Sequence, residues 1–381
     1  MSTFVFWLSL WGVLYIYLGY YLCLKLLCMF KQNDSEIDFV LDENYTPTVS
    51  VIIAAFNEEK HIENRIKNLL DQTYTGSIEI IVASDGSTDN TVNISQQYEK
   101  SGAVIFDYKE NRGRASVHND SIQSAKGEII VTTDAQTVFE KDFIEKIVAP
   151  FQGKNVGCAV GRLYYQNKET GIAQSEGFYW KWEVKTRILQ DQLGILMTGT
   201  GACTAFRKIL FKPMRPIDDI DYATTIDVIK AGQKVRYIEK AIAYDEAPET
   251  LDAELNGRIR SSKRFVGTIS RWGCSNWLRH PFYSWSMMSH KFMRWSSPFF
   301  LIALFISNVF LLGSFFYNVF MLLIVVSILL TAIGSMKNSI ALRIPFALKS
   351  YSFFVANLGF LLGFIRIATG RIPVKYKMPE K

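Results

Sequence analysis

Cysteine is scarce in this chain, and its spacing excludes two common roles. The 381 residues include five cysteines, none in a CxxC arrangement, and Cys23 and Cys28 lie in one apolar segment. Disulfide-stabilised domains and structural zinc sites both need suitably spaced groups of cysteines. Neither is expected here, and free thiols suit a polar part that faces the reducing cytosol.

Charged side chains are also few. They make up 20% of the residues, whereas hydrophobic residues make up 49% and gather at the two ends of the chain. This distribution is typical of a membrane protein rather than of an ordinary soluble enzyme. The formal charge of +6 is modest, and the basic residues lie mainly beyond residue 257. They favour a membrane surface or phosphate groups over a nucleic-acid groove, so no nucleic-acid partner is expected.

The N-terminal segment has no charged side chain from position 4 to position 24. About 20 apolar residues in a helix cross the ~30 Å hydrocarbon core of a bilayer. A basic front region and a small-residue cleavage site are both missing, which favours a retained transmembrane anchor, residues 1–31, over a signal peptide. Lys25 and Lys31 on its far side predict that the following domain faces the cytoplasm.

The last third of the chain is apolar again. Forty-two uncharged residues separate Arg294 from Lys337, enough for two membrane spans with a turn near residues 313–318. A third run, residues 350–365, either crosses the membrane or forms a re-entrant or interfacial segment. Crossing is preferred, although it would leave the basic tail (371–381) outside, against the positive-inside rule.

Tryptophan and basic residues alternate just before these spans. This mixture, over residues 266–297, predicts an interfacial amphipathic region. Residues 298–370 would then hold two or three C-terminal transmembrane helices. Together with the N-terminal anchor, they predict an integral, multi-pass membrane protein.

Strand-like and helix-like segments alternate between the two apolar ends, from residue 46 to residue 265. Short β-branched runs predict strands, and amphipathic stretches predict helices. Strands are expected at 48–56, 78–84, 103–108, 128–133, 156–165 and near 234–238. Helices are expected at 57–70, 114–125, 141–151, 172–192 and from the acidic cluster 218–221 through 231. This alternation predicts an α/β fold with a doubly wound parallel sheet.

Acidic residues stand where two of these strands should end. Asp85 closes the second strand, and Asp134 follows the buried run Ile129–Val131. Open α/β sheets bind ligands at the carboxyl edge because successive loops converge there. A carboxylate at that edge can hold a hard cation against phosphate oxygens. Asp134 is therefore the first candidate for a metal-binding residue, and Glu246, after the last strand, is a secondary candidate for a functional acid.

Six motifs follow one another between residues 48 and 265. They read SVIIAAFNEE (50–59), ASDGSTDNT (83–91), NRGRASVHN (111–119), GEIIVTTDAQT (127–137), TGTGACTAFRK (198–208) and DDIDYATTIDVIKAG (218–232). In order and spacing this stretch resembles the catalytic domain of an inverting family 2 glycosyltransferase. The resemblance implies a GT-A nucleotide-sugar-binding sheet with N-terminal and C-terminal transmembrane helices around it.

The resemblance also implies roles for the residues at the strand ends. Nucleotide contacts would come from Asn57, Glu58, Asp85, Arg114 and Asp134. Asp134 matches the first aspartate of the family's DxD motif, and Gln136 replaces the second carboxylate. These two side chains would hold Mg²⁺ or Mn²⁺, oxygen-seeking cations that keep part of their water shell and bind diphosphate.

The later motifs imply the catalytic and acceptor residues. An inverting transfer needs one carboxylate to take the proton of the acceptor hydroxyl, and Asp221 has the family's spacing for it, with Asp219 as the rival. The acceptor-binding turn would be Gly199, Thr200 and Gly201. Arg264 stands where processive synthases carry Gln-x-x-Arg-Trp and would contact the diphosphate, although the Gln and the Trp are both missing here.

The expected function is thus that of a membrane-bound hexosyltransferase. It would move a sugar from a nucleotide-sugar donor, with a UDP-sugar as the first expectation, to a lipid-linked or growing glycan at the cytoplasmic face. Two alternatives stay open. One is a processive polysaccharide synthase, and the other is a non-catalytic membrane scaffold that binds a nucleotide. A nucleotidyltransferase is not expected, because no glycine-rich loop follows the first strand.

Overall fold

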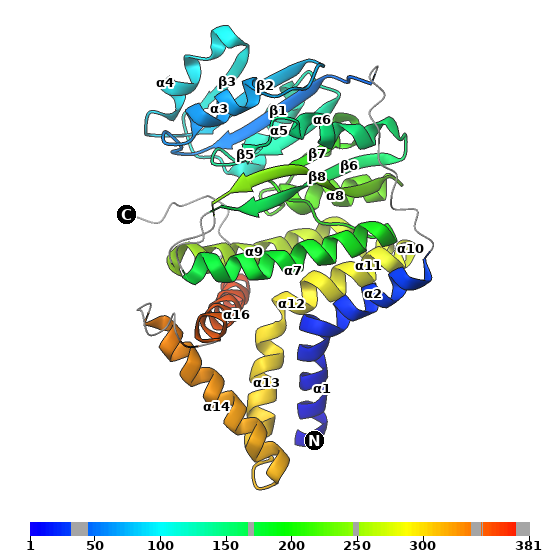
Figure 1. Ribbon diagram of the computed structural model, residues 1–381, viewed down its shortest axis with the longest axis vertical. Helices are drawn as coiled ribbons and strands as arrows, with labels where there is room; N and C mark the ends of the chain where they lie inside the picture. Colours follow the sequence, from blue (N-terminus) through cyan, green and yellow to red (C-terminus); the bar gives the residue numbers. More distant parts are fainter. Residues whose placement is uncertain (32–44, 167–170, 247–250, 337–343, 345, 371–381) are drawn as a thin grey trace.

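The molecule has an α/β part and an apolar helical part, joined by two long crossing helices (Figure 1). The computed structural model describes residues 1–31, 45–166, 171–246, 251–336, 344 and 346–370. The crossing helices are α7 (Gly171–Leu193) and α9 (Leu251–Trp272), which both lie beneath the sheet in this view. The basic tail 371–381 expected outside the membrane lies beyond the described residues.

The sheet is mixed and, within the described residues, eight-stranded. Its spatial order is β3-β2-β1-β4-β7-β6-β8-β5. The strands are β1 (Val49–Ala55), β2 (Ile78–Asp85), β3 (Ala103–Tyr108), β4 (Ile129–Thr133), β5 (Val138–Phe139), β6 (Val156–Tyr165), β7 (Thr204–Arg207) and β8 (Lys234–Asp245). The expected α/β fold is confirmed, but the sheet is not wholly parallel. The short strand β7 runs antiparallel to both of its neighbours, β4 and β6.

Buried β-branched residues explain the central strands. Val51, Ile52 and Ile53 of β1 are fully buried, as expected when helices cover both faces of a sheet. The covering helices are α3 (Ile62–Leu70), α4 (Thr91–Gln96), α5 (Arg114–Ser124), α6 (Phe143–Val148) and α8 (Ile220–Lys230). Helices α3 and α6 pack on one face, and α5 and α8 pack on the other. The sheet is therefore covered on both sides, and its strand ends are left to form a site.

One helix begins later than its sequence pattern predicts. The segment after β1 was expected to be helical from Asn57, whereas α3 begins at Ile62. Asn57 has a φ of 56°, in the left-handed region that interrupts a helix. Its backbone N–H donates to Ser87 Oγ at 3.1 Å, so the loop is fixed to the one that follows β2.

The apolar ends form helices, some of which join into stretches of membrane-spanning length. These helices are α1 (Ser2–Leu14), a π-helical turn (Tyr15–Gly19), α2 (Tyr20–Phe30), α13 (Ser297–Val309), α14 (Phe315–Ser335) and α16 (Ala347–Ala368). Three continuous stretches, 2–30, 315–335 and 347–368, are long and apolar enough to span a bilayer. The helical stretch before α13 and α13 itself form a pair bent by 59°, which would be a fourth span if counted as one.

Short helices connect α9 to this apolar part. They are α10 (Cys274–Arg279), α11 (Pro281–Met287), a π-helical turn (Met288–Phe292) and α12 (Met293–Trp295). Met287, Phe292 and Trp295 are buried in the cluster that also holds Ile226 and Val228 of α8. The region expected to lie at a membrane interface is thus also packed against the α/β part.

Candidate active site

The loops after β1 and β2 are joined into one rim at the carboxyl edge of the sheet. The Asn57 side-chain oxygen accepts from the backbone N–H of Thr88 at 2.8 Å, and the Glu58 backbone N–H donates to Thr91 Oγ1 at 2.8 Å. The Asn57 side-chain amide thus helps to hold the loop after β1 against the loop after β2. Burial raises the pKa of Glu58 to about 7, and the nearby Asp134 and Asp89 add to this rise.

Asp85 orders the start of the next helix. Its two carboxylate oxygens accept from the backbone N–H groups of Arg112 at 2.7 Å and Gly113 at 3.0 Å. Gly113 has a φ of 89°, which favours glycine and lets the chain turn directly into α5. Asp85 is 5% exposed. It therefore fixes the position of Arg114, the first residue of that helix.

Arg114 connects the two halves of the site. Its guanidinium forms an ion pair with Asp134, which directly follows β4. Asp134 raises the pKa of Arg114 most strongly, and Asp219 and Asp221 also contribute. Asp134, Asp219 and Asp221 therefore all act on the Arg114 guanidinium. Asp134 is 85 residues from Asp219 and 87 from Asp221 in the chain, so only folding brings them to one site.

The two candidate bases have different partners. Asp219 caps the N-terminus of α8 by accepting from the Asp221 backbone N–H at 3.1 Å, and it also accepts from Arg264 Nε at 2.9 Å. Burial alone would raise its pKa, but Arg264 and Arg114 hold the pKa of Asp219 below its usual value. Asp221 stands 3.5 Å from Arg264 Nη2. Burial and the neighbouring Asp219 raise the pKa of Asp221.

The glycine turn lies against Asp221. The Gly199 backbone N–H donates to the Asp221 carbonyl oxygen at 2.7 Å. A methyl group on Gly201 would stand 2.7 Å from Asp221 Oδ1, so glycine is required for this close approach. The Asp221 carboxylate therefore faces the turn expected to bind the acceptor.

A buried network missed by the sequence analysis supports that turn. Arg187 of α7 donates to Thr200 Oγ1 at 2.5 Å and to the Gly199 carbonyl oxygen at 3.3 Å. Its Nε also pairs with Glu183 at 3.1 Å. These partners are four positions apart in the chain, so their side chains share one face of α7. That spacing was the only sequence signal, and it did not point to residues 199 and 200.

A second missed residue is Asp245, the last residue of β8. It is 8% exposed, whereas the neighbouring Glu246, noted from the sequence, is exposed. Burial, with a further contribution from Asp134, raises the pKa of Asp245 to about 7, and a side-chain hydrogen bond from Gln136 opposes this rise. The strand was expected to end near 238, so its last residue could not be identified as a strand-end acid.

The residues around Asp134 fit a hard divalent cation. Asp134, Gln136 and Asp245 supply oxygen donors here, and Asp245 lies close enough to Asp134 for that carboxylate to add to the rise in pKa that burial causes. Within the described part of the chain, no three ligand-type side chains are grouped closely enough to hold a metal alone. Such a cation would therefore need water and substrate phosphate oxygens as further ligands.

Comparison with known proteins agrees with this architecture. Residues 50–214 match glycosyl transferase family 2. An N-acetylglucosaminyltransferase of Azorhizobium caulinodans is 29% identical over 235 residues, which cover 56% of this chain and 59% of that protein. A poly-beta-1,6-N-acetyl-D-glucosamine synthase of Staphylococcus aureus is 24% identical over 219 residues, covering 56% and 53%. The chain thus spans somewhat more than half the length of these relatives.

A solved structure resembles the chain over nearly its whole length. It is the mannosyltransferase PcManGT from Pyrobaculum calidifontis in complex with GDP-Man and Mn²⁺, with a TM-score of 0.72 and 18% identity. The match covers 96% of this chain and 99% of that one, so the apolar helices are included in the shared fold. Residues 50–214 of the chain thus match the glycosyl transferase family 2 domain, and the whole chain shares its fold with that mannosyltransferase.

Proposed function

We propose that the protein is a membrane-bound inverting glycosyltransferase. It transfers a sugar from a nucleotide-sugar donor to a hydroxyl of a lipid-linked or growing glycan, in cell-envelope or exopolysaccharide synthesis. The observation that carries the proposal is the convergence of separate motifs on two arginines. Arg114 pairs with Asp134, and Arg264 pairs with Asp219 and approaches Asp221.

The arrangement supports Asp221 as the general base. Asp219 is occupied by the helix cap and by Arg264, whereas Asp221 faces Gly201. In the proposed step the acceptor oxygen attacks the anomeric carbon, and the bond from that carbon to the diphosphate breaks. The hydroxyl proton passes to Asp221, and the nucleoside diphosphate leaves with the bonding electrons. Inversion follows from this single displacement.

The remaining residues would bind and orient the donor. Glu58 and the rim ordered by Asn57 and Asp85 support nucleotide binding, and Arg114 and Arg264 suit the diphosphate. Asp134 and Gln136 would hold Mg²⁺ or Mn²⁺. A bound cation would neutralise charge that develops on the departing diphosphate. Gly199, Thr200 and Gly201 would line the acceptor side.

The relatives' names suggest N-acetylglucosamine as the first sugar to test. The full chain, purified in detergent, should turn over UDP-N-acetylglucosamine or another nucleotide sugar when Mg²⁺ or Mn²⁺ is present. Asp221→Asn should lower the rate of transfer by about 10² to 10⁴, the usual contribution of a general base. The matched control is Asp71→Asn, whose side chain is 67% exposed. Equal activity of wild type and Asp221→Asn would refute the assignment.

The same assay tests the two alternatives. A processive synthase would release long products from a single preparation, whereas a single-addition enzyme would extend each acceptor by one unit. A non-catalytic scaffold would show neither transfer nor donor hydrolysis with any metal. The orientation of the catalytic part toward the cytoplasm also belongs to the proposal, and its support is Lys25 and Lys31 after the first span.

A further inference from the structure

The guanidinium of Arg187 in α7 is bonded to the glycine turn, residues 199–201. This buried side chain donates to Thr200 Oγ1 at 2.5 Å and to the Gly199 carbonyl oxygen at 3.3 Å. The Gly199 backbone N–H in turn donates to the Asp221 carbonyl oxygen at 2.7 Å. Two hydrogen bonds therefore connect Arg187 with the backbone of the proposed base, and the reaction proposed above does not use this arginine.

Glu183 fixes the direction of that guanidinium. It is buried one turn earlier in α7 and accepts from Arg187 Nε at 3.1 Å. The ring centroid of Trp180 lies 5.1 Å from the centre of the guanidinium. A guanidinium is a rigid planar fork, so a bond that fixes its Nε also aims its two other nitrogen atoms. The Glu183–Arg187 pair therefore aims these nitrogens at the glycine turn.

The π-helical turn Met288–Phe292 supplies further partners of Glu183. Lys291 Nζ donates to Glu183 Oε1 at 2.7 Å, and His290 Nε2 lies 3.0 Å from Glu183 Oε2. Both carboxylate oxygens have partners on this turn, so the carboxylate is held while the turn keeps its place. Turns of this kind are rare and occur frequently at functional sites. A displaced π-helical turn would move Glu183 and, with it, Arg187.

Tyr20 in α2 joins the N-terminal apolar segment to the same network. Gln190 Nε2 donates to the Tyr20 hydroxyl at 2.8 Å and lies 3.1 Å from His290 Nδ1. The Tyr20 ring also stacks on the His290 ring, with 5.7 Å between the centroids. All three side chains are buried. A continuous series of hydrogen bonds therefore runs from Tyr20 to the glycine turn, through Gln190, His290, Glu183 and Arg187.

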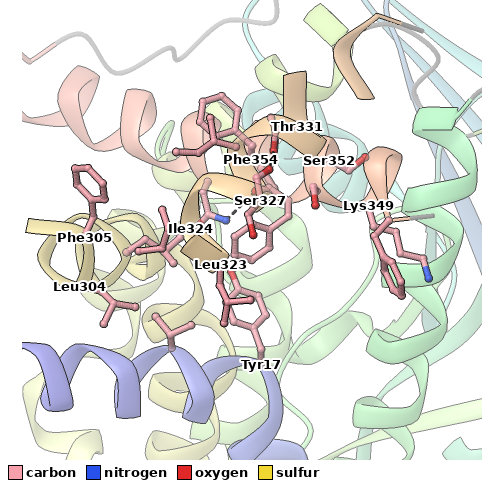
Figure 2. A pocket seen from close by; sticks show the side chains of 18 of the residues that line it. Tyr17, Leu304, Phe305, Leu323, Ile324, Ser327, Thr331, Lys349, Ser352 and Phe354 are labelled. Carbon is pink, nitrogen blue, oxygen red and sulfur yellow. Dashed lines mark hydrogen bonds between the residues drawn. The ribbon is translucent and has the colours of Figure 1, made fainter. Parts of the chain in front are cut away.

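A cavity of about 860 Å³ lies among the apolar helices (Figure 2). Tyr17 lines this cavity and donates its hydroxyl to Ser297 Oγ at 3.3 Å. Within the described chain, the four side chains that link Tyr20 to the glycine turn are not among the lining residues. The cavity is therefore separate from the linking side chains, and Tyr17 provides a hydroxyl on the same apolar segment as Tyr20 for comparison.

We propose that Arg187 is a positioning residue for the sugar acceptor and that the packing of α2 and the π-helical turn holds Arg187 in place. The intact network keeps the glycine turn and the Asp221 backbone where the acceptor hydroxyl loses its proton. The nucleotide residues stand on other loops, after β1, β2 and β4, so donor binding does not depend on the network. This inference rests on the function proposed above and makes the first apolar segment a support of the acceptor site as well as an anchor.

Two conservative variants test the two ends of the network. Arg187→Lys keeps a positive charge in α7 but replaces the fork by a single nitrogen, so it cannot bind Glu183 and both turn atoms as arginine does. Its control is Arg236→Lys, which changes an arginine paired with Asp191 of the same helix at 2.9 Å.

The second variant removes one oxygen atom at the other end. Tyr20→Phe keeps the ring that stacks on His290 and loses only the hydroxyl, which is bonded to Gln190 and Ser286. Its control is Tyr17→Phe, which makes the same change on the same apolar segment.

The first measurement needs no substrate. Hydrogen–deuterium exchange of the full chain in detergent, followed by mass spectrometry, reports local opening of the peptide 198–204. Each variant should raise the exchange rate of this peptide about fivefold, the effect of losing one hydrogen bond, and neither control should. Unchanged exchange in either variant would overturn the inference, and so would an equal rise in the controls, whether or not the enzyme is active.

The second measurement separates the acceptor from the donor. The acceptor probe is octyl N-acetyl-β-glucosaminide, a short lipid-linked saccharide, with the nucleotide sugar that the wild type turns over. Arg187→Lys should lower kcat about 10- to 100-fold and Tyr20→Phe about three- to tenfold, while the Kd of the donor nucleotide changes less than about twofold. A donor Kd that weakens as much as kcat falls would assign the network to the overall fold and overturn the proposed role.

The double variant tests whether the two ends act together. Because Arg187→Lys already releases the turn, adding Tyr20→Phe should lower kcat further by less than about twofold. Effects that multiply would show two independent perturbations and overturn the connection. A wild type that neither transfers nor hydrolyses the donor would refute the reaction proposed above, whereas the exchange measurement would still decide the network.

Discussion

At the scale of single residues, two aspartates in one motif differ because of what surrounds them. Asp219 and Asp221 belong to the same acidic cluster, and their spacing alone left the base undecided. The structure gives Asp219 a helix cap and a bond to Arg264, and it leaves Asp221 facing a glycine. A base that must hold a proton after transfer is helped by a raised pKa, as at Asp221.

Gly201→Ala tests the close approach to Asp221. Its methyl group would stand 2.7 Å from Asp221 Oδ1 and 3.4 Å from Arg114 Nη2, so the carboxylate must move. We expect kcat to fall about 10- to 100-fold, because small displacements at a reacting centre can cost this much. Donor binding, measured by nucleotide titration, should change little.

Gly153→Ala is the control for this variant, because its new methyl group would meet only the flexible side chain of Asn155 closely, at 3.2 Å. Equal kcat values for the Gly201→Ala enzyme and wild type would contradict the assigned position of the base.

Asp134→Asn tests the metal assignment. Removing one negative charge from a site of oxygen ligands weakens the binding of a hard divalent cation. The Mn²⁺ concentration that gives half the maximal rate should therefore rise at least about tenfold. The measurement is a metal titration of initial rates after chelation, with Asp71→Asn as the control. An unchanged metal requirement would remove Asp134 from the proposed cation site.

At the scale of secondary-structure elements, one buried glutamate joins the crossing helix α7 to the apolar part. Glu183 is 1% exposed and lies within 3.6 Å of Arg187, His290, Lys291 and Arg294. Burial alone would raise its pKa, but the surrounding charges hold the pKa of Glu183 well below its usual value. Because Arg187 also donates to Thr200 Oγ1 and to the Gly199 carbonyl oxygen, this network connects the apolar helices to the candidate site.

Glu183→Gln should destabilise the protein by about 3 to 5 kcal/mol, because it leaves a cluster of buried cations without their anion. Thermal unfolding in detergent measures the effect. The control is Glu63→Gln, which breaks an exposed pair with Lys67 and should leave the unfolding temperature nearly unchanged. Equal unfolding temperatures for Glu183→Gln and wild type would show that the network contributes little.

The effect of Glu183 should also depend on pH with a definite sign. Its folded pKa lies below the unfolded value of about 4.3, so its ionised form stabilises the fold at all higher pH values. The stabilising contribution of Glu183 should therefore persist as the pH falls from 7 to about 5 and be lost only below about 4. Unfolding measured against pH for wild type and Glu183→Gln checks this course.

At the scale of the whole molecule, native cysteines can report the membrane orientation. Cys274 is exposed in α10, next to the α/β part, whereas Cys158 and Cys203 are buried. The proposed topology places Cys274 in the cytoplasm and the turn between α13 and α14 outside. A membrane-impermeant maleimide should therefore label Cys274 in inside-out vesicles and not in intact cells.

Ser314→Cys, in that turn, should show the reverse pattern in a Cys274→Ser background. Ser314 is exposed, as Cys274 is, so a difference in labelling between the two positions would reflect the side of the membrane on which each lies. Labelling of both positions from the same side would contradict the proposed topology and leave α13 and α14 as a re-entrant pair.

The sequence by itself determined the α/β class, the apolar ends and most of the strand-end acids, because these features depend on local patterns of burial. Short β-branched runs are recognisable one segment at a time, and Asp85 and Asp134 stand directly at their ends. Tertiary structure decided what depends on contacts between distant segments. It placed β7 antiparallel in the sheet, brought Asp245 near Asp134, and paired Arg187 with Thr200. No local pattern records these pairings, because each partner gains its environment only when the chain has folded.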